Sequence, residues 1–167
     1  MQRLLIIGSP GAGKSTLSHQ ISARTGLPLH HMDKLHWLPG WIERDREEAL
    51  AEVKQVLAQV RWIIDGNYGS SLPNRITRAD TVVWLDYPTH TCLARVIKRW
   101  WQHRGRARPD MTEGCPERLN LEFLVYVLMF RSQWQNRNRA AMAGFGGTVL
   151  KFTTPAQTAS WLAGLSN

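Results

Sequence analysis

Residues 8–15 read Gly8-Ser9-Pro10-Gly11-Ala12-Gly13-Lys14-Ser15, which satisfies the pattern G-x-x-x-x-G-K-[ST] at every fixed position. The apolar run Leu4-Leu5-Ile6-Ile7 comes directly before this stretch. A strand that ends in a glycine-rich loop and continues as a helix directs several backbone N–H groups and a helix N-terminus at one point, which stabilises phosphate charge. The sequence therefore predicts a phosphate-binding loop for a nucleoside triphosphate.

The side chains of this loop have expected roles in binding ATP and Mg²⁺, with GTP as an alternative to ATP. Lys14 adds a positive charge for the β- and γ-phosphates, and Ser15 offers a hydroxyl to Mg²⁺. The loop residues expected to hold the nucleotide are Gly8, Gly11, Ala12, Gly13, Lys14, Ser15 and Thr16.

Length and composition predict one domain spanning residues 1–167. The chain has 167 residues, of which 43% are hydrophobic, so it can bury a core but is short for two folding units. Because the first strand leads into the loop within eight residues, we expect no targeting segment and a cytoplasmic protein. The longest apolar stretch, residues 123–130, is too short to cross a bilayer, so no membrane contact is expected.

Helix and strand patterns alternate along the chain. Strands are expected at residues 3–7, 28–31, 62–64, 81–85 and 148–152. Helices are expected at 14–24, 45–60, 89–101, 117–139 with an interruption, and 155–165, and a further short helix is expected to end near residue 78. Residues 35–42 are expected to form a loop. Five strands joined by helices predict an α/β fold, a parallel sheet with helices on both faces. Ligands bind beyond the carboxyl ends of such strands.

Three of the predicted strands are followed by a carboxylate. Asp65 and Asp86 both fit the acid that holds Mg²⁺ through water in a P-loop enzyme, and the pattern alone does not choose between them. Asp33 can orient a hydroxyl acceptor and take its proton, or it can cap a turn. If the acceptor is a phosphate, no base is needed and arginines should hold it instead.

Positive charge is concentrated in one part of the sequence. Residues 95–139 hold ten of the 21 basic residues and four acids, in a chain whose net charge is +8. Such a segment can contact nucleic acid, hold nucleotide phosphates or form a solvated face. Trp37 and Trp41 lie in the predicted loop at 35–42, on either side of Pro39-Gly40. Either tryptophan could stack on a nucleobase or pack in the core.

Several further motifs resemble adenylate kinases. Asp65-Gly66 resembles their D-G turn, and Leu85-Asp86-Tyr87-Pro88, followed by Arg95 and Arg99, resembles their L-D-x-P strand end and lid arginines. The sequence is more closely similar to the adenylate-kinase-like group called DNA topology modulation proteins, or FlaR-type. The stretches that carry this resemblance are His31-Met32-Asp33-Lys34-Leu35, Pro39-Gly40-Trp41, Asp65-Gly66-Asn67-Tyr68 and residues 106–115.

The resemblance implies a P-loop kinase fold of the nucleoside or nucleotide kinase type, with sheet order 2-3-1-4-5, an acceptor-side insertion at about 34–60 and a basic lid at about 102–117. It also implies roles for single residues. Asp65 would be the Mg²⁺-side carboxylate, Arg95 would lie against the adenine and Arg99 would reach the triphosphate. The lid arginines Arg104, Arg106 and Arg108 would close over the γ-phosphate.

Two departures from adenylate kinase bear on the acceptor. Adenylate kinases read D-G-F-P-R where this chain reads Asp65-Gly66-Asn67-Tyr68-Gly69, and residues 34–60 lack the pattern T-G-D-x-x-R, so AMP is not the expected acceptor. Arg75 or Arg78 could replace the missing charge. The expected catalytic residues are Lys14, Asp33, Arg99 and Arg106, and those expected to bind the acceptor are Asp33, Trp41, Asn67, Tyr68 and Arg75.

The function predicted from these observations is a Mg²⁺-dependent phosphotransferase that moves the γ-phosphate of ATP to an unidentified small-molecule acceptor. The alternative is an ATP-binding regulator that associates with DNA and modulates its topology. The kinase hypothesis is favoured because the basic residues lie where a nucleotide lid belongs and the sequence contains no recognised nucleic-acid-binding module. The sequence predicts neither the acceptor nor the oligomeric state.

Overall fold

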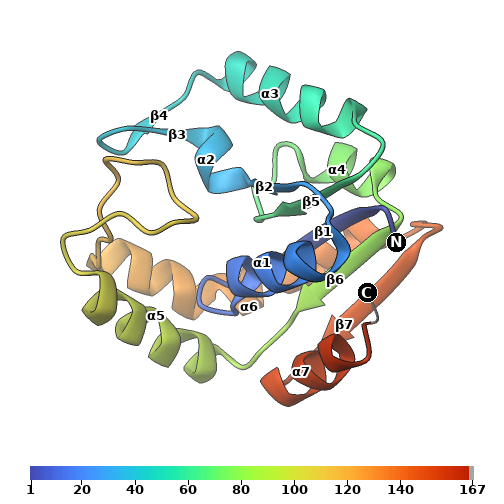
Figure 1. Cartoon of the computed structure of the whole chain (residues 1–167). Coiled ribbons are helices and arrows are strands. Elements are labelled where there is room, and N and C mark those ends of the chain that lie inside the picture. Colours follow the sequence, from blue (N-terminus) through green and yellow to red (C-terminus); the bar gives the residue numbers. More distant parts are fainter. Residues whose placement is uncertain (166–167) are drawn as a thin grey trace.

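The computed structural model describes residues 1–165, and its element order is shown in Figure 1. The strands are β1 (Arg3–Gly8), β2 (Leu29–His31), β3 (Trp37–Leu38), β4 (Ile42–Glu43), β5 (Trp62–Asp65), β6 (Thr81–Leu85) and β7 (Thr148–Phe152). The helices are α1 (Lys14–Thr25), α2 (Met32–His36), α3 (Arg46–Ala58), α4 (Leu72–Arg78), α5 (Thr89–His103), α6 (Leu121–Met142) and α7 (Pro155–Ala163).

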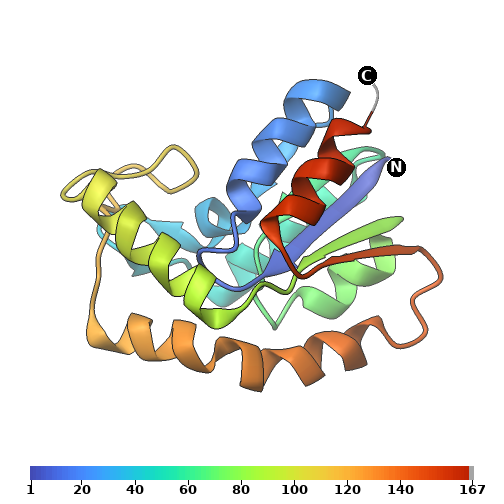
Figure 2. The same cartoon turned by 90° about the horizontal axis from the view of Figure 1, so that it is seen from below.

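Five of the strands form one parallel sheet in the order β2-β5-β1-β6-β7. Numbered among themselves along the chain, these strands have the order 2-3-1-4-5, so the predicted fold class and topology are confirmed. Helices α1 and α7 lie on one side of the sheet and α6 on the other (Figure 2). The central strand β1 ends at Gly8, which places the glycine-rich loop at the carboxyl edge of the sheet.

The core consists of two apolar clusters, one on each face of the sheet. Successive side chains of a strand point to opposite faces, so Leu4 and Ile6 join one cluster while Leu5 and Ile7 join the other. The first cluster includes Leu17 and Ile21 of α1, and the second includes buried side chains of α3 and α4. Packing on both faces fixes β1, and therefore fixes the start of the loop that follows it.

Helix ends follow local capping chemistry. The carboxylate of Asp45 accepts hydrogen bonds from the N–H groups of Glu47 and Glu48 at the start of α3, as predicted. Helix α6 differs from the prediction: it starts at Leu121, where the Asn120 side chain caps it, and it is continuous for 22 residues. Within residues 1–165, no helix combines the length and the apolar content needed to span a membrane.

The predicted loop at residues 35–42 is wrong. The segment contains the end of α2 and an antiparallel hairpin, β3–β4, in which Trp37 is paired with Glu43. The turn between the strands uses positive φ angles at Gly40 and Trp41, of 83° and 64°. Strands of two residues are too short to produce an alternating pattern, which is why the sequence carried no sign of them.

Candidate active site

A cavity of about 1290 Å³ opens above the carboxyl ends of the strands. Its walls come from the glycine-rich loop, the segment after β5, helices α5, α6 and α7, the β3–β4 hairpin and the loop at 104–120 between α5 and α6. Sites for single small molecules occupy about 300–1,000 Å³. The cavity therefore has room for a nucleotide and a second small molecule together.

The glycine-rich loop has the conformation that phosphate binding requires. Gly11 and Gly13 adopt φ angles of 79° and 92°, in the left-handed region that side chains disfavour. The Lys14 ammonium lies against the loop, where it donates to the carbonyl oxygens of Gly8 at 3.0 Å and Ser9 at 3.2 Å. Burial lowers the pKa of Lys14, and the nearby carboxylates of Asp33 and Asp65 oppose that shift.

Asn67 holds the start of this loop. Its side-chain oxygen accepts from the Gly8 N–H at 3.0 Å, and its side-chain NH₂ donates to the Gly8 carbonyl at 2.8 Å. Asn67 also lines the cavity. Because its amide group bonds both backbone groups of Gly8, Asn67 positions the start of the loop, and its contact with an acceptor stays a prediction.

Asp65 faces the cavity from the end of β5 and is buried. One carboxylate oxygen lies 2.8 Å from Nδ1 of His31, and the other accepts from the Ser18 hydroxyl at 3.1 Å. Ser15, the predicted metal-side hydroxyl, lines the same cavity. Hydroxyl and carboxylate oxygens are the protein ligands that suit Mg²⁺, so the donor set fits the predicted ion.

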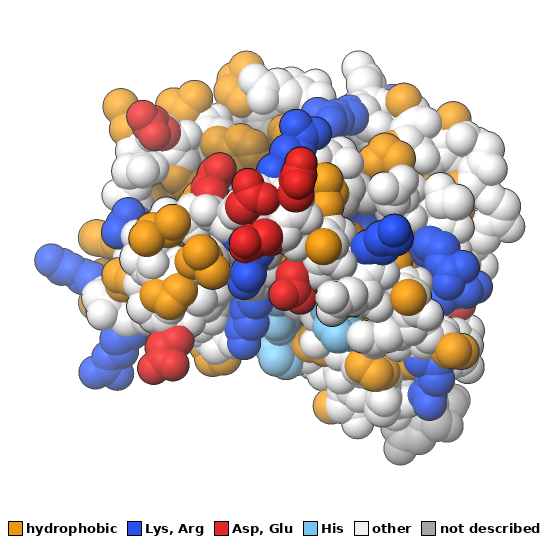
Figure 3. Space-filling model, turned by 90° about the horizontal axis from the view of Figure 1, so that it is seen from above, with side chains coloured by type: hydrophobic (Ala, Val, Ile, Leu, Met, Phe, Trp, Pro, Cys, Tyr) orange, Lys and Arg blue, Asp and Glu red, His pale blue; other side chains and the backbone are white. Residues whose placement is uncertain are grey.

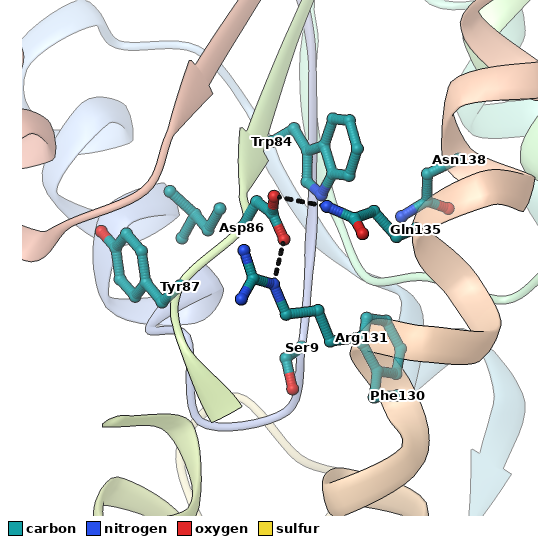
Figure 4. Close-up of a pocket in the computed structure, with 9 residues that line it drawn as sticks. Ser9, Trp84, Asp86, Tyr87, Phe130, Arg131, Gln135 and Asn138 are labelled. Carbon is teal, nitrogen blue, oxygen red and sulfur yellow. Dashed lines mark hydrogen bonds and ion pairs between the residues drawn. The ribbon is translucent and has the colours of Figure 1, made fainter. Parts of the chain in front are cut away.

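Asp86 lies elsewhere, at the end of β6, where it meets the side chains of Arg131 and Gln135 from α6 (Figure 4). Its carboxylate oxygens lie 3.2 Å from Nε of Arg131, 3.1 Å from Nε2 of Gln135 and 2.9 Å from Nζ of Lys151. The space beside these groups is about 10 Å³, room for one water molecule at most. Of the two alternative metal-side acids, only Asp65 faces the large cavity.

Asp33 lies on α2 and lines the cavity beside Tyr68. The Tyr68 hydroxyl donates to Oδ1 of Asp33 at 2.7 Å. Burial raises the pKa of Tyr68, and the adjacent Asp33 carboxylate adds to the shift, so the phenol stays protonated. Asp33 and Tyr68 therefore lie together in the cavity lining, and their part in binding an acceptor stays a prediction.

Arg75 has a different position from the one predicted. Its side chain is completely buried in α4 and does not line the cavity. The guanidinium donates to the hydroxyl of Ser71 and to the carbonyl oxygens of Gly66, Asn67 and Tyr68. All three of its nitrogens are engaged and its side chain is outside the cavity lining, so Arg75 holds the segment after β5 and does not reach an acceptor in the cavity.

The loop at 104–120 carries an ion-pair network centred on Glu117, which the sequence analysis did not single out. Its two carboxylate oxygens lie 2.8 Å from Nε of Arg99 and 2.7 Å from Nε of Arg108. Arg99 and Arg108 line the cavity, whereas Arg106 is exposed and outside it. Of the three predicted lid arginines, Arg108 lines the cavity, and Arg104 and Arg106 are outside its lining.

The same loop touches the phosphate-binding loop through Asp110. Burial favours the neutral acid, but Arg108, at 2.8 Å, and a hydrogen bond from Ser15 together hold the pKa of Asp110 below its ordinary value. Asp110 and Ser15, the residue predicted to bind the metal, both line the cavity.

Four hydrogen bonds join this loop to the β3–β4 hairpin, and we call this contact the clasp. The Thr112 hydroxyl donates to the Trp37 carbonyl at 2.7 Å, and the Gly40 N–H donates to the Gly114 carbonyl at 3.0 Å. The remaining two run from the Cys115 thiol to the Leu38 carbonyl and from Nε1 of Trp41 to the Pro116 carbonyl. Trp37 and Trp41, on the hairpin side of the clasp, line the cavity.

The opposite end of the cavity suits a nucleobase. Arg95 lies over the ring of Tyr87, with its Cζ 5.6 Å from the ring centroid, and donates to the Ala12 carbonyl at 3.3 Å. Thr158, Ala159 and Leu162 of α7 line the cavity beside them. Arg95 lines the cavity here, and its contact with the adenine stays a prediction.

Comparison with solved structures identifies the fold. The chain is similar to the deoxyadenosine kinase from M. mycoides with bound dATP, at 14% identity and a TM-score of 0.56, over 98% of this chain and 97% of that one. It is also similar to two shikimate kinases. The enzyme from Acinetobacter baumannii in complex with shikimate has 12% identity and a TM-score of 0.58, over 98% of this chain and 89% of that one.

The shikimate kinase from Bacteroides thetaiotaomicron has 15% identity and a TM-score of 0.56, over 97% and 94% of the two chains. At these identities the likeness establishes the fold alone: the chain is an α/β protein with the P-loop kinase fold. The sequence matches no protein-family model and no curated protein.

Proposed function

We propose that the protein is a small-molecule kinase that transfers the γ-phosphoryl group of Mg²⁺-ATP to a hydroxyl acceptor. The observation that carries this proposal is that one cavity holds both parts of the expected site. The phosphate-binding loop and Asp65 form one wall of this cavity, and the Asp33–Tyr68 pair forms another. Its volume of about 1290 Å³ suits two ligands at once. A carboxylate at the acceptor position favours a hydroxyl over a phosphate, because an anionic acceptor would be repelled by Asp33.

The fold neighbours support a phosphotransferase of this kind. One is a kinase with bound dATP, and another is a kinase in complex with shikimate. Both names describe transfer to small molecules, and this chain covers almost the full length of each. The phosphate-binding loop supplies the nucleotide site in this chain from its own residues, independently of those names.

In the proposed reaction, Asp33 orients the acceptor hydroxyl and receives its proton at Oδ2, while Tyr68 holds the other oxygen. The acceptor oxygen forms a bond to the γ-phosphorus as the bond from that phosphorus to the β,γ-bridging oxygen breaks, which releases ADP. Lys14 and Arg99 are placed to stabilise the charge on the transferred group. Ser15, with Asp65 through water, would hold Mg²⁺, which supplies charge neutralisation between the β- and γ-phosphates when it is bound.

The lid network has a place in this scheme. Arg99 and Arg108 are held by Glu117 in the ligand-free chain, and the same guanidinium groups face the space beside the phosphate-binding loop. Triphosphate oxygens can accept their remaining N–H donors, because each guanidinium has five. We therefore assign transition-state stabilisation to Arg99 and Arg108.

The test is the variant Asp33→Asn, assayed by coupled ADP release over a panel of hydroxyl metabolites. Loss of a general base lowers rates by about 10²–10⁴-fold, so kcat should fall by that factor while calorimetric binding of Mg²⁺-ATP is unchanged. Tyr68→Phe is the companion variant, and a smaller loss is expected because the base remains. Unchanged turnover of Asp33→Asn would refute the assignment.

Association with DNA has less support. Arg99, Arg108 and Arg131 of the basic segment are paired with acids within the chain. On the face seen from above in Figure 1, a central group of acidic side chains and a few separate ones lie among separate Lys and Arg groups (Figure 3). If DNA binding nevertheless occurs, its affinity should fall steeply with salt because phosphate contacts release counterions.

A further inference from the structure

The proposed acceptor end of the cavity has an aromatic wall that starts at the proton-accepting carboxylate. From Asp33 the contacts run to the Tyr68 hydroxyl at 2.7 Å, then to the ring of His36, whose centroid is 4.6 Å from that of Tyr68. The wall continues through Trp37, 4.9 Å from His36, to Trp41, 5.4 Å from Trp37. Tyr68, Trp37 and Trp41 line the cavity, whereas His36 joins them from outside its lining, so an acceptor with its hydroxyl at Asp33 would extend along these three rings.

Further rings lie at the same end of the cavity on α6. Tyr126 and Trp134 line the cavity, and the Phe130 ring packs between them, stacked on Trp134 with centroids 5.8 Å apart. Rings from the β3–β4 hairpin and from α6 thus line one space. Aromatic walls of this kind favour a flat ring, because a π face can stack on it or meet its edge.

Three arginines near this end differ in their access to the cavity. Arg75 is buried among carbonyl groups, and Arg137, which lies over the ring of Trp134 at 4.7 Å, is outside the cavity lining. Arg118 lines the cavity, and its Cζ lies 5.5 Å from the centroid of Trp41. Of these three, Arg118 alone could meet an acceptor anion there, while Asp33 would repel one, so the balance of charge favours a neutral acceptor.

We propose that the acceptor is a neutral compound of the nucleoside class, in which a flat heteroaromatic ring carries a free hydroxyl through a short sugar. The hydroxyl lies at Asp33, and the ring lies between the tryptophans of the hairpin and the aromatic side chains of α6. This inference rests on the proposed function for its chemistry, but the binding of the ring depends on the wall alone.

The experiment measures transfer and binding separately. Transfer of ³²P from γ-labelled ATP is assayed with a panel of ribo- and deoxyribonucleosides, with ribose as the sugar lacking the ring, with AMP as a phosphate acceptor, and with shikimate as a carboxylate-bearing alcohol. Binding of the same compounds is measured by calorimetry in the presence of Mg²⁺ and a non-hydrolysable ATP analogue. Each measurement is repeated on Trp37→Leu and on the control Trp101→Leu, whose exposed ring lies outside the cavity.

The proposal expects at least one nucleoside to be phosphorylated with kcat/KM at least 100-fold above ribose, AMP and shikimate. Trp37→Leu should raise the KM of that nucleoside about tenfold or more with little change in kcat, and Trp101→Leu should match the wild type. Faster transfer to ribose, AMP or shikimate than to every nucleoside would overturn the acceptor class and leave the kinase function standing.

Absence of transfer to any compound would count against the kinase function, and the binding data then decide the inference. If Trp37→Leu weakens nucleoside binding and Trp101→Leu leaves it unchanged, the result would support a binding site for the ring even though no phosphoryl transfer occurs. Absence of nucleoside binding to the wild type, or binding that Trp37→Leu leaves unchanged, would overturn it.

Discussion

Replacing Arg75 with methionine separates a positioning role from an acceptor-binding role. The guanidinium is completely buried and bonds one hydroxyl and three carbonyl oxygens in the segment after β5. Methionine fills a similar volume but has no donor. The Arg75→Met variant therefore leaves the carbonyl groups of Gly66, Asn67 and Tyr68 without their partner.

The magnitude follows from those three groups. A buried acceptor left without a partner costs about 1–3 kcal/mol, and a relaxed backbone or an entering water recovers part of the cost. Because burying the guanidinium itself has a desolvation cost that the variant removes, the net loss should be about 3–5 kcal/mol. That is a large part of the roughly 5–15 kcal/mol by which a domain is stable. For a chain of 167 residues it corresponds to a drop in Tm of about 6–20 °C.

Thermal and urea unfolding measure this loss, with Arg78→Met as the matched control. Arg78 lies on the same helix and is exposed, with one hydrogen bond, to the Leu57 carbonyl at 3.2 Å. Its replacement should cost about 1 kcal/mol or less. If Arg75→Met has wild-type stability and changes only the KM of the acceptor, the positioning role is refuted and the acceptor contact predicted from the sequence is correct.

Two further predictions concern the charges around the nucleotide. Glu117→Gln removes the charge that holds Arg99 and Arg108, so the hydrogen exchange of residues 104–117 should rise in the ligand-free protein. With Mg²⁺-ATP bound, these residues should return to wild-type protection. Equal exchange of the variant and the wild type without ligand would contradict the role of Glu117 in holding the two arginines. Because the pKa of Lys14 is lower than the ordinary value of 10.5, its ammonium loses its proton at a lower pH than a free lysine does. The affinity for ATP should therefore weaken as the pH rises toward 10.5. Lys14→Arg should bind with little pH dependence over the same range, and a wild-type affinity that stays constant to pH 10.5 would contradict the shift.

The parts of the fold set by local patterns could be predicted from the sequence. β6 and β7 have the predicted bounds, because both are runs of apolar or β-branched residues between turn signals. The phosphate-binding loop could be predicted because its pattern fixes a backbone shape. The β3–β4 hairpin could not, since its register depends on the clasp with residues 112–116, which are distant in sequence.

The candidate site shows the same limit. Asp33, Tyr68 and Asp65 could be placed near the ligands because each follows a strand at the carboxyl edge of the sheet. The roles of Arg75 and Glu117 depend on which partner each charged side chain meets in three dimensions, and residue type alone does not encode that. Glu117 is one of three acids in a basic loop, and nothing in the sequence distinguishes it from Asp110 and Glu113.

The most direct measurement is calorimetric titration of the wild type and of Lys14→Met with ATP in the presence of Mg²⁺. The phosphate-binding loop predicts one site per chain in the wild type and a loss of affinity of about 1.5–3 kcal/mol in the variant, the size of a charge-assisted hydrogen bond. Absence of heat in the wild type, or equal affinity in the two proteins, would contradict the assignment of this loop to a triphosphate.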